Sequence, residues 1–244
     1  MIIDSVKHPV MEKIRHLKGG NLFTFILYDT QHIDWLLQSQ NPQYRVEFIV
    51  SIHKKNSQWP WIHHQVKPSI FHHVLGSRYE TVAIVNWTNN TESHNHGVIL
   101  DHIVDFGNIG SIIRNSYMLG VKNFLIINNL NIFNSKTIDS CRGLIFFSNL
   151  FMVPDINSGL EYVKDNNIYP LIGGFGGVPL RQYGSITKGH WIVVGNETNG
   201  CHKDWQSIDH EIITIEQEDN SICDSMNVSC AAAILVYCLM GNKK

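Results

Sequence analysis

The chain has 244 residues, of which 43% are hydrophobic and 16% are charged, and its formal net charge is -2. This composition excludes an intrinsically disordered chain, which combines low hydrophobicity with high net charge. No stretch reaches the ~18 apolar residues of a membrane helix, so we expect no membrane partner. The acidic Asp4 near the start argues against a secretory signal. A near-neutral charge by itself does not indicate a nucleic-acid partner.

The cysteines and histidines argue against a disulfide framework and against a metal site. The five cysteines form no CxxC pair, which predicts reduced thiols and a cytoplasmic protein rather than a disulfide framework or a zinc site. Ten of the fourteen histidines lie in residues 1–96, including the doublets His63-His64 and His72-His73. Adjacent histidines point in different directions, and no carboxylate or cysteine lies at ligand spacing, so we expect no metal.

Residues 1–80 are predicted to form a small α/β domain. Strands at residues 22–28 and 46–52 flank a helix at residues 32–38, and an irregular region that contains Pro60 follows, up to Pro68. A further strand at residues 81–87 leads into the polar run 88–96, so residues 81–96 are interpreted as a connecting strand and linker.

A regular alternation of strands and helices begins at residue 97. The expected strands are 98–104, 124–127, 168–172, 191–194 and 211–215, and the expected helices are 108–119, 136–147, 158–166 and 226–240. Continuous β-branched runs between helices are typical of a parallel sheet that is buried on both faces. Residues 97–244 therefore predict an α/β domain with a mostly parallel sheet flanked by helices.

The segment DFGNIGSIIR, residues 105–114, lies where a strand passes into a helix, the usual place for ligands in such a sheet. Its glycines permit a tight turn, and Asn108 is the expected N-cap. Arg114 follows about 9 Å further along the helix axis. By itself the segment is more typical of a capped amphipathic helix with a solvent-facing arginine.

Three further segments follow strands or precede helices. VVGNETNG, residues 193–200, is by itself more typical of an ordinary turn, but backbone groups beside Gly195 can also hold a flat heterocycle with Glu197 as an anchor. In DSMNVSCAAAIL, residues 224–235, Ser225 and Asn227 are placed to cap a helix with a very small face, which predicts tight burial. The segment GGFGG, residues 173–177, lacks the GxGxxG order, so it predicts a loop lining a site rather than a dinucleotide fingerprint.

The order and spacing of these segments resemble the SpoU family of RNA ribose 2′-O-methyltransferases, in the SPOUT superfamily. Residues 105–114 match the first family motif, residues 195–200 the second, and residues 225–234 the third. The resemblance implies a deep C-terminal trefoil knot, a homodimer, and S-adenosylmethionine (SAM) as cofactor. The first 80 residues resemble the accessory RNA-binding domain of the family, which is similar to ribosomal protein L30e.

The resemblance also implies which residues carry the function, a methyl transfer from SAM to a ribose 2′-hydroxyl of a structured RNA, either rRNA or tRNA. Carried over by position, the catalytic residues are Asn108, Arg114, Glu197, Ser225 and Asn227. The cofactor pocket is formed by Gly174, Val194, Gly195, Ile215, Ser225 and Met226, mostly through backbone atoms. No metal is implied.

The sequence departs from the family pattern at three places. Phe106 replaces the usual proline of the first motif, Asn199 replaces a common arginine of the second, and Glu216-Gln217 replace a Pro-Met pair. An alternative interpretation is therefore a SpoU-like RNA-binding module that has lost methyl transfer. A nucleotide-binding enzyme on a Rossmann sheet is a third interpretation, but the chain lacks its glycine motif.

Overall fold

The computed structural model describes residues 2–18, 23–89, 96–184, 186, 189–218 and 225–240. Contacts divide the chain into two units, one of Met1–Thr88 with Asn131–Ile138 and the other of Asn89–Leu130 with Asp139–Lys244. Each unit has its own sheet. Residues 90–95, most of the polar run interpreted as a linker, lie outside the described residues.

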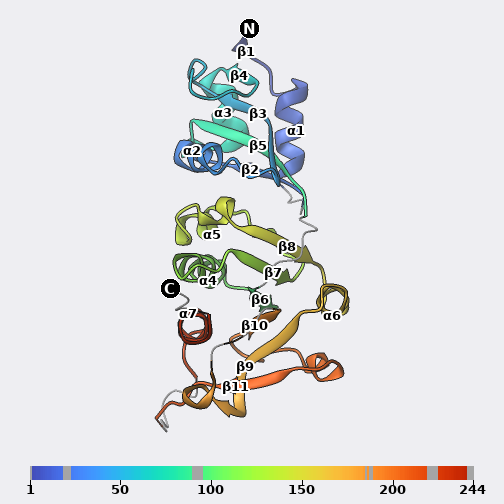
Figure 1. Ribbon diagram of the computed structural model, residues 1–244. Coiled ribbons are helices and arrows are strands. Elements are labelled where there is room, and N and C mark those ends of the chain that lie inside the picture. The colour runs from blue at the N-terminus through green and yellow to red at the C-terminus, as the bar shows by residue number, and fades with distance from the viewer. Residues whose placement is uncertain are drawn as a thin grey trace. The chain divides into compact units, whose positions relative to one another are not determined.

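The first unit is a five-stranded sheet with helices (Figure 1). Its elements are β1 (Ile2–Ile3), α1 (Pro9–Leu17), β2 (Thr24–Leu27), α2 (Thr30–Ser39), β3 (Tyr44–Ser51), β4 (His63–Val66), α3 (Pro68–Leu75) and β5 (Thr81–Trp87). The strand order is β1-β4-β3-β5-β2, with β4 parallel to both its neighbours and β5 antiparallel to both of its own. Apolar side chains of α1 and α3, such as Met11, Ile14 and Phe71, share one buried core with the strands.

The region predicted to be irregular contains two regular elements, so that expectation was wrong. His63–Val66 forms β4, between β1 and β3, and α3 begins at Pro68. A proline in the first helical turn has no N–H to lose and its fixed φ suits the helix, so Pro68 starts α3 rather than interrupting structure. The same arrangement begins α1 at Pro9.

Phe133 brings a distant segment into the first unit. Its ring stacks on Phe25 at a centroid distance of 4.2 Å and meets the edge of Tyr44 at 5.8 Å. Trp87 lies 5.6 Å away in a tilted arrangement. Aromatic pairs of this kind stabilise a core beyond the area they bury, which accounts for the grouping of Asn131–Ile138 with the N-terminal strands.

The second unit contains a six-stranded sheet in the order β11-β9-β10-β6-β7-β8, in which all neighbouring strands are parallel. Its strands are β6 (Gly97–Asp101), β7 (Asn123–Ile127), β8 (Asn149–Val153), β9 (Tyr169–Pro179), β10 (His190–Gly195) and β11 (Glu211–Thr214). The helices α4 (Phe106–Met118) and α7 (Val228–Leu239) pack against each other on one face, and α6 (Ile156–Asp165) covers the opposite face (Figure 1). The prediction of a parallel α/β sheet flanked by helices is confirmed.

Two helix expectations in residues 97–244 were wrong in part. The helix expected at residues 136–147 is split into α5 (Ser135–Ser140) and the 3-10 turn η1 (Leu144–Phe147), because Arg142 and Gly143 adopt φ of 54° and 74°. Left-handed residues cannot continue a right-handed helix. Helix α7, expected to be tightly buried, is buried on one side only, since Ile234 and Tyr237 are exposed.

The trefoil knot and the likeness of residues 1–80 to L30e stay predictions. None of the described helices is long and apolar enough to cross a membrane.

Gly97, at the start of β6, tests the packing of this sheet. A Cβ at this position would lie 2.4 Å from the ring of Trp191, a fully buried side chain on the neighbouring strand. We expect Gly97→Ala to lower the free energy of unfolding by about 1–3 kcal/mol, the usual range for overpacking. Gly184→Ala is the matched control, because nothing lies within 4 Å of its added Cβ. Equal stability of the two variants in urea titrations would contradict the described packing.

Candidate active site

The candidate site forms where β6 and β10 end and α4 and α7 begin. Asp101 and Gly195, the last residues of β6 and β10, are paired in register. The carboxyl ends of parallel strands and the first turns of the helices that follow them therefore share one edge of the sheet, which is where ligands bind in such folds.

Asn108 connects three segments at this edge. Its side-chain Nδ2 donates a hydrogen bond to Glu197 Oε1 at 2.6 Å, and its Oδ1 accepts one from Asn227 Nδ2 at 3.0 Å. A bond to a carboxylate is shorter and stronger than one between neutral groups. Three of the five residues expected to be catalytic thus form one hydrogen-bonded network.

The expectation that Asn108 caps α4 was wrong. Asp105 is the N-cap, and its carboxylate accepts from the backbone N–H of Asn108 at 2.8 Å. A carboxylate is well suited to this place because it satisfies a free N–H and interacts favourably with the helix dipole. The side chain of Asn108 is therefore available for its contacts with Glu197 and Asn227.

Asn227 is the N-cap of α7, as expected. Its Oδ1 accepts from the backbone N–H of Ser229 at 2.8 Å and from Ser229 Oγ at 2.6 Å. The amide oxygen is thus engaged at the helix and the amide nitrogen at Asn108, so both ends of the side chain are held. Ser225 lies just before this cap and lines the adjoining pocket.

The loop after β10 is shaped by close backbone approach. The backbone N–H and C=O of Asn196 pair with those of Gly200, at 3.0 and 2.8 Å. A Cβ on Gly195 would lie 2.3 Å from the backbone N of Cys201, so this turn requires glycine. Asn196 Nδ2 also donates to the backbone carbonyl of His102 at 3.1 Å, which ties the loop to the end of β6.

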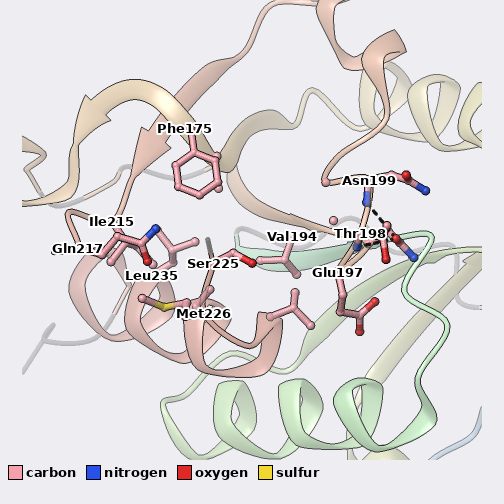
Figure 2. Close-up of a pocket in the computed structure, with 17 residues that line it drawn as sticks. Phe175, Val194, Glu197, Thr198, Asn199, Ile215, Gln217, Ser225, Met226 and Leu235 are labelled. Atoms are coloured by element: carbon pink, nitrogen blue, oxygen red, sulfur yellow. Dashed lines mark hydrogen bonds between the residues drawn. The ribbon is translucent and has the colours of Figure 1, made fainter. Parts of the chain in front are cut away.

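A pocket of about 460 Å³ opens beside this loop (Figure 2). It is lined by main chain and side chains of Gly173, Gly174, Phe175, Val194, Gly195, Asn196, Glu197, Thr198, Asn199, Gly200, Ile215, Gln217, Ser225, Met226, Val228, Ala231 and Leu235. All six residues expected to bind the cofactor are in this set. Its volume is in the range of small-molecule sites, and Glu197 is the one ionisable side chain among the described residues that line it.

Arg114 lies apart from the network and the pocket. Its side chain is exposed on α4, it does not line the pocket, and the described residues give it no hydrogen-bond or ion-pair partner. The structure of one chain therefore brings together Asn108, Glu197 and Asn227 and leaves the guanidinium of Arg114 facing solvent.

Asp101 is a buried carboxylate that sequence reasoning missed. Its side chain is 1% exposed, and its Oδ2 accepts from the backbone N–H of His202 at 2.6 Å and from Trp205 Nε1 at 2.8 Å. His102 Nδ1 lies 2.5 Å from the other oxygen. These bonds hold His202 and Trp205, in the segment that follows the Asn196–Gly200 loop. The 3-10 turn η3 (Lys203–Ser207) lies in this segment. An acid at the end of an otherwise apolar strand was the available signal.

Cys201, next to this carboxylate, is not a nucleophile. Burial, and to a smaller extent the charge of Asp101, raises the pKa of the Cys201 thiol well above its usual range. The thiol therefore stays protonated at neutral pH, and only a thiolate reacts readily. No group of His, Cys, Asp and Glu that could hold a metal ion occurs among the described residues.

Comparison with known proteins agrees with this geometry. The model of the SpoU rRNA Methylase family matches residues 95–237, more than half of the chain. The chain belongs to this family. The predicted family membership is confirmed, and the matched range contains the network, the pocket and Asp101.

The individual relatives and the solved structure described below share less than a quarter of their aligned residues with this chain. The chain is 23% identical over 154 residues to a 23S rRNA (uridine(2479)-2′-O)-methyltransferase of Streptomyces viridochromogenes, across 58% of this chain and 50% of that protein. It is 24% identical over 143 residues to a 23S rRNA (adenosine(1067)-2′-O)-methyltransferase of Streptomyces laurentii, across 57% and 52%. The chain spans about half the length of these curated relatives.

The SpoU methyltransferase AviRb of Streptomyces viridochromogenes, solved in complex with AdoMet, has a similar fold. The TM-score is 0.78 at 18% identity, and the match covers 95% of this chain and 97% of that one. At this level of identity the likeness shows a shared fold.

Asp101→Asn tests the buried carboxylate. The amide oxygen can still accept from the His202 N–H and from Trp205 Nε1, but the charge that strengthens both bonds is lost, and the NH2 group faces His102 Nδ1. We expect a loss of about 1–3 kcal/mol in the free energy of unfolding. The control Asp165→Asn changes an exposed carboxylate at the end of α6 and should be nearly neutral. If chemical denaturation finds Asp101→Asn as stable as the control, these bonds do not support the site.

Proposed function

We propose that this chain is a SAM-dependent RNA ribose 2′-O-methyltransferase. The observation that carries the proposal is the network of Asn108, Glu197 and Asn227, which joins the three family motifs at the rim of one pocket. Membership of the SpoU family and the named activities of the two relatives support it. Because both relatives are 23S rRNA methyltransferases, rRNA is favoured over tRNA as the substrate.

The pocket residues fit SAM. As the resemblance implies, the main chain at Gly174 and Gly195 would bind the polar edge of an adenine or an amino acid, and Val194, Ile215 and Met226 would make apolar contacts. The carboxylate of Glu197 suits a ligand with net positive charge. Pockets of this kind combine an apolar lining with a few placed polar groups.

The residues of the network would position the RNA. SAM supplies an electrophilic methyl group when bound, and the ribose hydroxyl that accepts it gives up its proton. Asn108, held by Glu197 and Asn227, is placed to orient a ribose or phosphate at the rim. Holding the reacting groups in line is a large part of such catalysis.

Arg114 would act on the RNA electrostatically. A guanidinium stays charged in proteins and forms bidentate bonds with phosphate, so we assign it the target phosphate rather than the role of a base. Its exposed side chain leaves that contact open.

The alternative function is a SpoU-like RNA-binding module without turnover. Asn199 lines the pocket where the family commonly has arginine, which removes a cation from the presumed RNA side. The exposed Gln217 lines it where the family has Met, and Glu216 and Glu218 beside it would repel a phosphate. These departures affect the rim, whereas the network residues are those of the family.

We further propose a homodimer, as the resemblance implies. The exposed side of α7 carries an apolar stripe of Cys230, Ile234, Tyr237 and Cys238, at the i, i+4, i+7, i+8 spacing of one helix face. Met118 on α4, the helix packed against α7, is 74% exposed. Exposed apolar surface of this kind marks interaction sites.

The free thiols among the described residues are consistent with a reducing compartment, and we place the protein in the cytoplasm.

Methylation of RNA tests the proposed function. The purified protein should transfer label from SAM to unmodified rRNA transcripts, with the label mapped to a ribose 2′-oxygen by mass spectrometry. Arg114→Ala should lower the rate by about 10²–10³-fold, as for loss of one placed electrostatic group, and leave SAM affinity unchanged by calorimetry. Arg114→Lys, which keeps the charge, should retain part of the rate. SAM binding without methyl transfer to either rRNA or tRNA would favour the alternative function.

Ile234→Lys tests the homodimer. A charge in the apolar stripe would be desolvated at an interface, which is unfavourable, so we expect a monomer in size-exclusion chromatography with light scattering. Glu161→Lys on the exposed side of α6 is the control and should leave the mass unchanged. A wild-type monomer would contradict the homodimer, and a dimer in both variants would place the stripe outside the interface.

A further inference from the structure

A five-residue bulge interrupts the pairing of β9 with β11. Ile172 is paired with Ile212, but the next pair is Val178 with Ile213. The five residues 173–177 therefore lie outside the ladder opposite a single peptide of β11. Bulges are common beside active sites, where they direct a side chain to a new position.

Glycines anchor both ends of this bulge. A Cβ on Gly177 would lie 2.1 Å from the backbone oxygen of Ile212, and the N–H of Gly177 donates to Thr214 Oγ1 at 2.9 Å. A Cβ on Gly173 would lie 2.9 Å from Leu235 Cδ1. Such approach of backbone to its neighbours is possible only without a side chain. The bulge is thus seated on β11 and α7.

Phe175 is the one residue with a side chain in this bulge, and its ring lies at the pocket. The side chain is 68% exposed although it lines the pocket. Figure 2 shows the ring across the pocket from Met226. No other aromatic ring of the described residues pairs with it, in contrast to Phe133, which is buried in a ring cluster. Most of the ring is therefore open to a ligand at the mouth of the pocket.

We propose that Phe175 is a stacking platform for a nucleobase at the mouth of the pocket. A phenyl face binds any planar heterocycle, which is how many proteins hold unstacked bases of RNA. Thr198, Asn199 and Gln217 line the same pocket and offer polar groups to the edge of such a base. The inference rests on the proposed function, which supplies two nucleobases: the adenine of SAM and the base of the target nucleotide.

The size of the effect follows from the energy of base stacking on an aromatic side chain. Removing the ring should weaken binding of the stacked partner by about 5- to 150-fold. The bulge is anchored through its glycines rather than through Phe175, so the melting temperature of the variants should equal that of the wild type.

Three variants at Phe175 test the platform. Phe175→Ala removes the ring, Phe175→Leu keeps an apolar side chain without a π face, and Phe175→Tyr keeps the face. SAM affinity is measured by calorimetry, and the KM for unmodified rRNA transcripts by label transfer. Phe175→Ala and Phe175→Leu should both bind the stacked partner more weakly, and Phe175→Tyr should bind it as the wild type does. A loss in SAM affinity assigns the adenine of the cofactor, and a rise only in the RNA KM assigns the base of the target nucleotide.

Two results would overturn the platform while leaving the proposed function intact. In the first, all three variants bind SAM and RNA as the wild type does. In the second, Phe175→Leu binds SAM and RNA as tightly as Phe175→Tyr, which would mean that Phe175 makes only an apolar contact. A wild-type protein that binds neither SAM nor the transcripts would overturn the platform and the proposed function together.

Discussion

The candidate site depends on the two hydrogen bonds of the Asn108 side-chain amide. The amide donates to Glu197, in the loop after β10, and accepts from Asn227, at the start of α7. Asn227 in turn caps α7 with its oxygen. Donor and acceptor roles are complementary throughout, so a change at one member leaves a polar group of another without its partner. The relative positions of three segments are held by these few bonds.

Around this network, the pocket is shaped chiefly by main chain that approaches main chain. Gly195 permits the tight pairing of Asn196 with Gly200, and Gly177 permits the bulge to rest on Ile212. A binding surface made of backbone groups is insensitive to most side-chain changes. Asn199 and Gln217, which depart from the family pattern, line the same pocket. Under the proposed function, these departures change the polar groups that the pocket offers to its ligands.

The near-neutral net charge of -2 is the sum of the charges of two unlike parts. Residues 1–96 contain nine Lys or Arg against seven Asp or Glu, whereas residues 97–244 contain ten against fourteen. An enzyme that contacts RNA at a few phosphates needs a local basic surface rather than a basic chain. The low total therefore does not argue against the proposed RNA substrate, for which it predicts modest, salt-sensitive affinity.

The sequence by itself determined the parallel α/β pattern, which is read from apolar runs between helices. Its motifs at strand ends carry the resemblance that implied the family and six of the residues that line the pocket. It also placed Asn227 correctly as the cap of α7. It could not show that the region before Pro68 contains a strand, because β4 is a short polar segment whose partners are distant in the chain.

Only the tertiary structure decided what Asn108 and Asp101 do and where Phe175 points. Asparagine is a residue type that commonly caps helices, yet the hydrogen-bond partners of the Asn108 side chain are 89 and 119 residues away. Asp101 is satisfied by groups 101 and 104 residues away, and the bulge that presents Phe175 exists only through the pairing with β11. Hydrogen bonds and pairing across such separations arise when the chain folds, and no local pattern of residues encodes them.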